Sequence, residues 1–181
     1  MKKKILLTAV LVLLLSSALG AFAADNSYAW MTSYNKPNHI NVYGGVGYYF
    51  GGFSVTGGAE YIISDFNIGP VPLEWGIMAQ AILGFSNYSY TTGLDWGAAP
   101  MASLHWGTNF GGGAKFDFFI SAGLGLYGGA YWAFYNTGAV GLGFASYDGA
   151  MWMFSNNLGL LLEYGYIGWT STAAIGVVWK L

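Results

Sequence analysis

The chain has 181 residues, of which 8% are charged and 19% are aromatic, and it contains no cysteine. Soluble domains carry about 25% charged residues, so most of this surface is not built to face water. The lack of cysteine excludes disulfides, thiolate metal sites and a cysteine nucleophile. After residue 23, three lysines stand against eight acidic residues, which argues against nucleic acid as a partner.

The first 23 residues have the features of a secretory signal peptide. Lysines at positions 2–4 precede an uncharged apolar run, and Ala21 and Ala23 have the spacing of an A-x-A cleavage site. We expect cleavage after Ala23, and the alternative is an uncleaved membrane anchor. The chain then divides into a signal peptide (1–23), an N-terminal lead (24–38) and one domain (39–181).

After the signal peptide, apolar residues alternate with polar or small residues. No stretch reaches the 18 or more continuous apolar residues of a spanning helix, whereas the alternating segments have the length of a tilted membrane strand. Without spanning helices, only a closed barrel satisfies every backbone hydrogen bond in a bilayer. We therefore predict an all-β fold, a closed antiparallel up-and-down transmembrane β-barrel of about eight strands.

The predicted strands follow one another in chain order with short breaks. They cover 39–50, 53–64, 73–86, about 96–107, 114–127, about 139–147, 157–168 and the last nine residues, "AAIGVVWKL". The segments 65–72, 87–95, 108–113, 128–138 and 148–156 are predicted to be turns or loops, the longest near 128–138. Pro100 makes the fourth strand the least regular, because proline cannot donate to a ladder. An even number of strands returns both termini to one side, so the last strand can pair with the first.

The alternation places a set of polar residues on the inward face. We predict that they form a lumen network: Glu60, Glu74, Gln80, His105, Lys115, Asp117, Glu163 and Lys180. Ion pairs among them would plug and rigidify the barrel, and the alternative is a cation-permissive path lined by the acidic surplus. An eight-stranded barrel is just wide enough to be filled by side chains, which favours the plug. Inward glycines, among them Gly141 and Gly143, are predicted where side chains would crowd.

The C-terminal residues carry a resemblance to a known family. Bacterial outer-membrane barrels of the OmpA/OmpX type commonly end in a polar residue, any residue, glycine, two of any, a hydrophobic or aromatic residue, any residue and an aromatic residue. Gly176, Trp179 and Leu181 fall on the last three of these positions, whereas Ala174 replaces the polar residue and Leu181 the aromatic one. The signal peptide and alternating strands extend the resemblance to OmpA/OmpX/OmpW-like barrels over the chain.

This resemblance implies an outer-membrane location with lipid around the barrel. It also implies that the barrel-assembly machinery recognises Gly176, Trp179 and Leu181. Because the chain has no catalytic, metal or cofactor motif, we predict a structural or surface-interaction role and no enzyme activity. The G-x-G-x-x-G at 123–128 lies inside a strand rather than before a helix, and neither histidine has metal-ligand spacing.

Two alternative functions stay open. OmpW-like barrels pass hydrophobic compounds through a partly apolar lumen, so the resemblance also allows a narrow channel for small hydrophobic solutes or ions. Lipid A deacylases and palmitoyltransferases are eight-stranded barrels that act with serine and histidine, which makes Ser103 and His105 candidates for an acyl-modifying enzyme. Both of these residues are predicted to point into the lumen, and this orientation argues against an enzyme working on the outer leaflet.

Overall fold

The computed structural model describes residues 31–35, 37–49, 52–69, 71–88, 91–109, 115–131 and 140–181. The predicted signal peptide, with Ala21 and Ala23, lies outside the described residues. The described residues form nine strands: β1 (Met31–Thr32), β2 (Ile40–Tyr49), β3 (Gly52–Ile68), β4 (Val71–Tyr88), β5 (Thr91–Asn109), β6 (Lys115–Tyr131), β7 (Val140–Met153), β8 (Leu158–Ile167) and β9 (Thr170–Lys180). In this part of the chain, no helix is long and apolar enough to cross a membrane.

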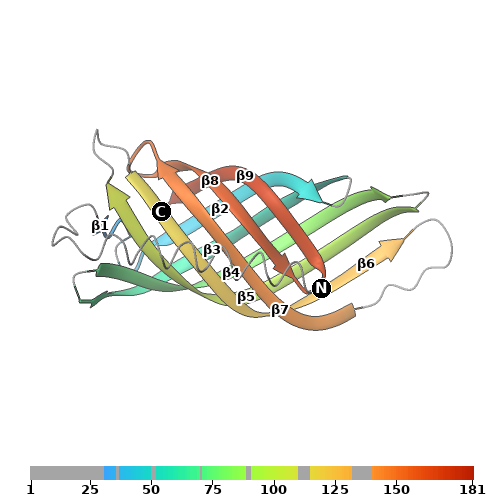
Figure 1. Cartoon of the computed structure of the whole chain (residues 1–181), viewed down its shortest axis with the longest axis horizontal. Helices are drawn as coiled ribbons and strands as arrows, with labels where there is room; N and C mark the ends of the chain where they lie inside the picture. The colour runs from blue at the N-terminus through green and yellow to red at the C-terminus, as the bar shows by residue number, and fades with distance from the viewer. Residues whose placement is uncertain are drawn as a thin grey trace. The chain divides into compact units, whose positions relative to one another are not determined.

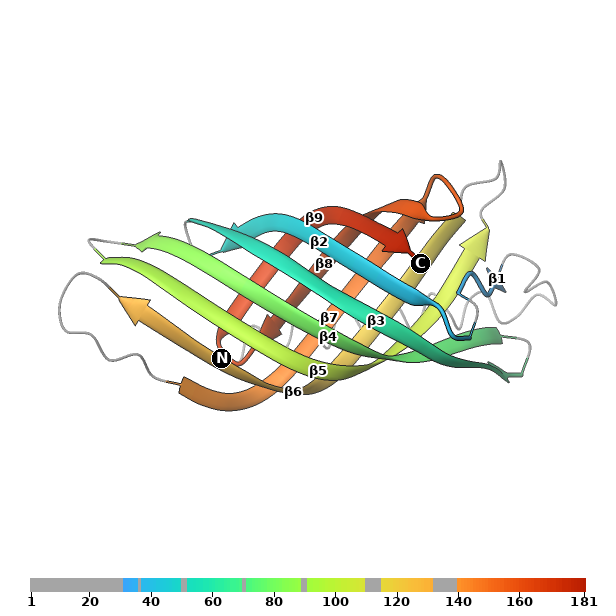
Figure 2. The ribbon, with the colours of Figure 1, turned by 180° about the vertical axis from the view of Figure 1, so that it is seen from behind.

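Strands β2 to β9 form a closed antiparallel barrel of eight strands (Figures 1 and 2). Each strand pairs with the next along the chain, and β9 returns to pair with β2 from Asn41↔Lys180 to Tyr48↔Ala173. The predicted fold class is therefore confirmed, including closure by the C-terminal strand. Closure leaves neither of these two strands with an unpaired edge along the shared register.

Side chains alternate between the outside of the barrel and its lumen. In β8 the pattern is complete, because Leu158, Leu160 and Leu162 are exposed while the residues between them are buried. This period of two follows from the pleat of a strand. The outward face is mostly apolar and the inward face carries most of the charges, which reverses the arrangement of a soluble domain.

Several hairpins extend further than the sequence pattern predicted. The segments 65–72, 87–95 and 148–156 were expected to be loops, but β3 runs to Ile68, β4 to Tyr88 and β7 to Met153. Backbone pairing does not need apolar alternation, so strands continue where the pattern stops. The turn between β3 and β4 is short, and Gly69 takes a φ of 59° there. Most of the longest predicted loop, at 132–138, lies outside the described residues.

Pro100 lies inside β5 and marks an irregularity in its ladder. It pairs with Ala79 of β4, but the pairing of β5 with β6 passes from Ala98↔Leu126 to Met101↔Gly123. Proline has no N–H to donate, which explains why the interruption falls here.

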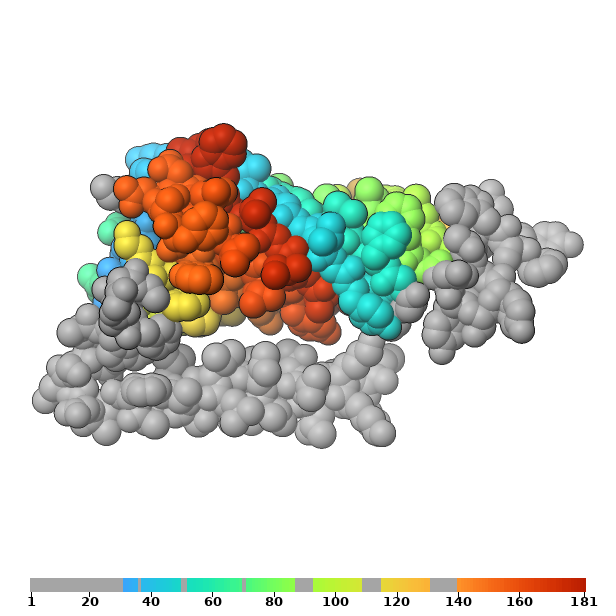
Figure 3. Space-filling model, turned by 90° about the horizontal axis from the view of Figure 1, so that it is seen from above, coloured from blue at the N-terminus to red at the C-terminus, as the bar shows by residue number. Residues whose placement is uncertain are grey.

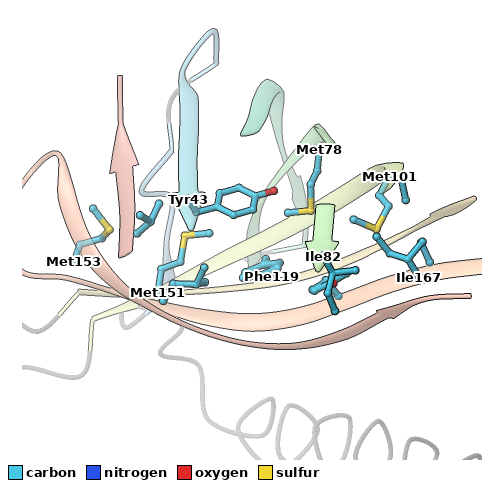
Figure 4. Close-up of a cluster of buried hydrophobic side chains, with 13 residues drawn as sticks. Tyr43, Met78, Ile82, Met101, Phe119, Met151, Met153 and Ile167 are labelled. Atoms are coloured by element: carbon cyan, nitrogen blue, oxygen red, sulfur yellow. The ribbon is translucent and has the colours of Figure 1, made fainter. Parts of the chain in front are cut away.

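The middle of the lumen is filled with buried apolar side chains (Figure 4). Tyr43, Met78, Met101, Phe119 and Met151 meet there from five different strands. Inward glycines make room for the rings, since a Cβ at Gly149 would lie 2.5 Å from Phe119 Cε1 and one at Gly141 would lie 2.6 Å from the Tyr127 hydroxyl oxygen. The lumen is therefore a packed core rather than an empty bore.

The N-terminal lead contributes to one end of the barrel. Strand β1 pairs with β5 through Met31↔Thr108 and Thr32↔Gly107, beyond the last β4–β5 pair at Glu74↔His105. The lead therefore takes the position beside β5 that β4 has left. Residues 33–35 continue from this strand to the polar end of the lumen.

Candidate functional site

The polar residues of the lumen gather around His105, which is fully buried in β5. Its Nε2 lies 2.7 Å from Glu60 Oε1 on β3, and its Nδ1 lies 3.2 Å from Asp117 Oδ1 on β6. The ring of Phe119 stacks against the imidazole with a centroid distance of 5.6 Å. Both ring nitrogens face carboxylates, and an imidazole donates from both only when it is protonated. The geometry therefore fits an imidazolium that bridges two acids.

Asn35, from the lead, joins this group to a second carboxylate. Its backbone N–H donates to Glu74 Oε1 at 2.9 Å, and its Nδ2 donates to Glu74 Oε2 at 2.5 Å and to Asp117 Oδ2 at 2.7 Å. The hydroxyl of Ser33 also donates to Glu74. The side chain of Asn35 is only 2% exposed, so the lead is anchored inside the barrel end rather than lying on its surface.

Lys180 brings the last strand into the same network. Its Nζ donates to Asn35 Oδ1 at 2.5 Å and lies 3.7 Å from Asp117 Oδ2. Because β9 closes the barrel against β2, this contact ties the closing strand to β6 on the other side of the lumen. We call this group, Asn35, Asn41, Glu60, Glu74, Ser103, His105, Asp117 and Lys180, the end network.

Glu163 and Gln80 form a separate contact further along the lumen. Glu163 Oε1 accepts a hydrogen bond from Thr56 Oγ1 at 2.5 Å, and Gln80 Nε2 donates to both carboxylate oxygens at 3.3 Å. Lys115 shares the inward face of β6 with Asp117 but is half-buried and takes no part in the end network. The structure therefore gathers five of the eight predicted lumen residues, sets two apart as a pair and leaves Lys115 aside.

The arrangement of Ser103 and His105 does not match an activated nucleophile. The Ser103 hydroxyl donates to Glu60, the same carboxylate that faces His105 Nε2. A serine nucleophile needs a free imidazole nitrogen to take its proton, and here both nitrogens face acids. Ser103 and His105 are also buried at the lumen end that contains the lead, away from any exposed surface.

Glu74, His105 and Asp117 present ligand-type atoms that all lie within 4.8 Å of one another. This grouping was not visible in the sequence, because the three residues come from three strands with no motif spacing. Their oxygens already accept hydrogen bonds from Ser33 and Asn35. The chain's own donors therefore satisfy the cluster.

Of the residues of the C-terminal pattern, Gly176 and Trp179 lie on β9 and Leu181 follows it directly. Gly176 pairs with Gly45 of β2, and Trp179 and Leu181 point outward with exposures of 59% and 61%. That the barrel-assembly machinery recognises Gly176, Trp179 and Leu181 stays a prediction.

Two members of the end network were missed in the sequence. Asn41 occupies an inward position of the first barrel strand, where its Nδ2 donates to Glu60 Oε2 at 3.1 Å, and alternation alone identifies that position. Asn35 lies before the barrel in a segment without periodicity, so no sequence signal placed it in the lumen.

Replacing Asn35 with alanine is expected to lower the free energy of unfolding by about 2–3 kcal/mol. Hydrogen bonds to charged partners contribute about 1.5–3 kcal/mol, and Glu74 and Asp117 would both lose the Asn35 Nδ2 donor. Urea unfolding in detergent, followed by tryptophan fluorescence, measures this. Asn67→Ala, on the exposed part of β3, is the control. Equal stability of the two variants would show that the lead is not anchored by Asn35.

Comparisons with known proteins place the fold. No family model and no curated protein matches the chain. Among solved structures, the N-terminal β-barrel domain of OprF from Pseudomonas aeruginosa matches with a TM-score of 0.54 and 16% identity, over 81% of this chain and 100% of that domain. The attachment invasion locus protein Ail of Yersinia pestis has 14% identity and a TM-score of 0.48, over 79% of this chain and 96% of its own.

Neisserial surface protein A is similar at the same level, with 16% identity and a TM-score of 0.48 over 79% of this chain and 96% of its own. At these identities the likeness concerns the fold. The chain has the fold of the small eight-stranded outer-membrane barrels, as the match to the OprF domain shows.

Proposed function

We propose that this chain is an integral outer-membrane β-barrel protein with a closed lumen and a structural or surface-interaction role. The observation that supports this most strongly is the apolar outer surface. Bulky apolar side chains are exposed on β2, β3, β4, β6, β7, β8 and β9, for example Val46 at 60%, Leu142 at 70% and Phe144 at 75%. An apolar surface of this extent aggregates in water, whereas in a bilayer it contacts the apolar lipid chains.

Cell fractionation tests this proposal. The full chain, expressed in a bacterium with an outer membrane, is expected to sediment with that membrane and to resist a urea wash, because the belt of outward side chains is embedded in lipid. Recovery in the soluble periplasmic fraction would contradict the proposal. The same proposal includes recognition of Gly176, Trp179 and Leu181 by the barrel-assembly machinery. It also divides the chain into a signal peptide (1–23), a lead (24–38) and the barrel (39–181).

The filled lumen favours the structural role over the channel alternative. The apolar cluster occupies the middle, and the end network together with Asn35 occupies one end. We expect no steady single-channel conductance from the reconstituted protein in planar bilayers in 1 M KCl. Regular conductance steps, with a protein shown to be folded by its gel mobility, would instead support a conduit.

The same geometry argues against the acyl-modifying alternative. Ser103 and His105 share Glu60 and do not face each other as nucleophile and base. Lipid A from cells that express the chain is expected to keep its acyl pattern, as measured by mass spectrometry.

A further inference from the structure

Asp148 lies on the outward face of β7, in the middle of the apolar surface. Its strand neighbour Tyr147 is fully buried, while the residues paired with Asp148, Ile120 of β6 and Tyr164 of β8, are 42% and 54% exposed on the outside. The expected loop at 148–156 hid this position in the sequence. Among the outward positions of the described barrel strands, Asp148 is the one that carries a charge.

A carboxylate at this place is unfavourable in lipid. Along β7 it lies between the exposed apolar residues Phe144 and Trp152, so it is inside the belt rather than at its edge. It makes no hydrogen bond or ion pair with any residue in the described part of the chain. Ionisable groups inside a membrane are costly and commonly have a partner. A partner for Asp148 would therefore come from another molecule.

The surroundings of Asp148 contain hydroxyl groups and small side chains. Ser146 precedes Asp148 on the same face of β7, Tyr164 and Tyr166 lie on β8, and Ser171 of β9 pairs with Tyr166. Ala122, Ala150 and Ala173 occupy outward positions between them. Small residues allow the backbones of two membrane proteins to come close, and hydroxyls supply donors for a carboxylate. We call this region of β6 to β9 the Asp148 face; Figure 3 shows the outer surface of β7 to β9 in orange and red.

A shallow apolar hollow adjoins Asp148 on this face. It is lined by Phe116, Ala150, Trp152, Leu160, Leu162 and Ile175. Ala150 and Trp152 follow Asp148 along β7, and β7 runs there toward the barrel end that holds the end network. The acidic group therefore lies nearer the middle of the barrel and the hollow nearer its end.

This order does not suit a phospholipid. A lipid on this side of the membrane has its head group at the barrel end and its acyl chains toward the middle, which would place acyl chain on the carboxylate. A second protein surface with both hydroxyl groups and bulky apolar side chains fits better. The Asp148 face itself has both, so it is complementary to its own copy.

We infer that the Asp148 face is an interface between two copies of this chain in the membrane. The inference rests on the proposed membrane location. Two copies inserted in the same direction are related by a two-fold axis along the membrane normal. If this axis passes between β7 and β8, Asp148 of each copy lies opposite the tyrosines of the other copy's β8 and accepts a hydrogen bond from a hydroxyl. The hollow then receives an apolar side chain of the second copy.

Cross-linking through a single introduced cysteine tests the interface, because the chain has no cysteine of its own. Ser146→Cys places a thiol on the Asp148 face, and Ile77→Cys places one at an exposed position of β4 on a different part of the barrel. The full chain is treated with a short bismaleimide in outer-membrane preparations. We expect at least tenfold more cross-linked homodimer from Ser146→Cys than from Ile77→Cys.

Substitutions at Asp148 in the Ser146→Cys chain identify the contact. Asp148→Leu removes the acceptor while keeping the bulk, and we expect dimer cross-linking to fall to the level of Ile77→Cys. Asp148→Asn keeps an acceptor oxygen, and we expect it to retain more than half of the cross-linking.

Several outcomes would overturn the interface. They are equal cross-linking at positions 146 and 77, no effect of Asp148→Leu, or a product whose mass is not that of two copies. Heat-dependent gel mobility of the same samples is read alongside. A protein that is folded in the membrane but does not cross-link contradicts the interface alone, whereas a protein absent from the membrane contradicts the proposed function.

Discussion

Replacing Asp117 with alanine is expected to lower the free energy of unfolding by about 3–5 kcal/mol. Asp117 is fully buried, faces His105 Nδ1 at 3.2 Å and lies 3.7 Å from Lys180 Nζ. Removing one partner of a buried charge pair leaves the other charges desolvated and uncompensated, which accounts for this magnitude. Urea unfolding of the detergent-refolded protein, with midpoint and slope both measured, gives the value.

The control for Asp117 is Asp65→Ala, at an exposed position near the β3–β4 turn. We expect this change to stay within about 0.5 kcal/mol, as surface substitutions usually do. Asp117→Asn should fall between the two alanine variants, because it keeps an acceptor for His105 but loses the charge. Similar stability of the Asp117 and Asp65 alanine variants would show that the end network does not stabilise the barrel.

Replacing Phe119 with alanine is expected to destabilise the barrel by about 3–5 kcal/mol, the usual cost of removing a buried phenylalanine. The ring is 1% exposed, stacks on His105 and fills the space left by Gly149. Its loss therefore removes contacts in the apolar cluster and also uncovers the face of the His105 ring on which it stacks. Urea unfolding of the variant and of the unchanged protein in detergent measures this difference in the free energy of unfolding.

Phe144→Ala is the matched control, since Phe144 points outward and is 75% exposed. Its removal changes contacts with detergent rather than with the lumen, so we expect well under half of the effect seen at Phe119. If the two variants were equally stable, the lumen side chains would not form a cooperative core.

The regular alternation made much of the fold predictable. In β8, each outward leucine or tyrosine is followed by a buried residue, so the face of Glu163 followed directly from its position. The same reasoning placed Glu60, His105 and Asp117 inside. A closed barrel then follows from physics rather than from any motif, because lipid leaves no other way to satisfy strand edges.

Other features could not be predicted because they depend on contacts between distant segments. Asn35 enters the lumen through contacts with Glu74 and Asp117, 39 and 82 residues away, and nothing local indicates it. Lys115 has the right periodicity but lies at the very start of β6, so the inward face there is only half-buried. Asp148 falls at the start of the loop predicted at 148–156, although the strand pairing continues past it.

The end network and the apolar cluster have different physical roles. The cluster buries apolar side chains in the middle of the lumen, away from water. The end network joins β2, β3, β4, β5, β6 and β9 to the lead by hydrogen bonds, most of them to carboxylates. It therefore holds these segments together at the barrel end, where its side chains lie buried in the lumen.

Gel mobility of residues 24–181, refolded in detergent and compared with and without boiling, tests most directly whether the chain forms a membrane barrel. We expect the unboiled protein to migrate as a compact species and to shift on boiling, because a closed barrel resists detergent until it is heated. A single band with unchanged mobility, from protein that stays dissolved in buffer without detergent, would show that the chain does not form a membrane barrel.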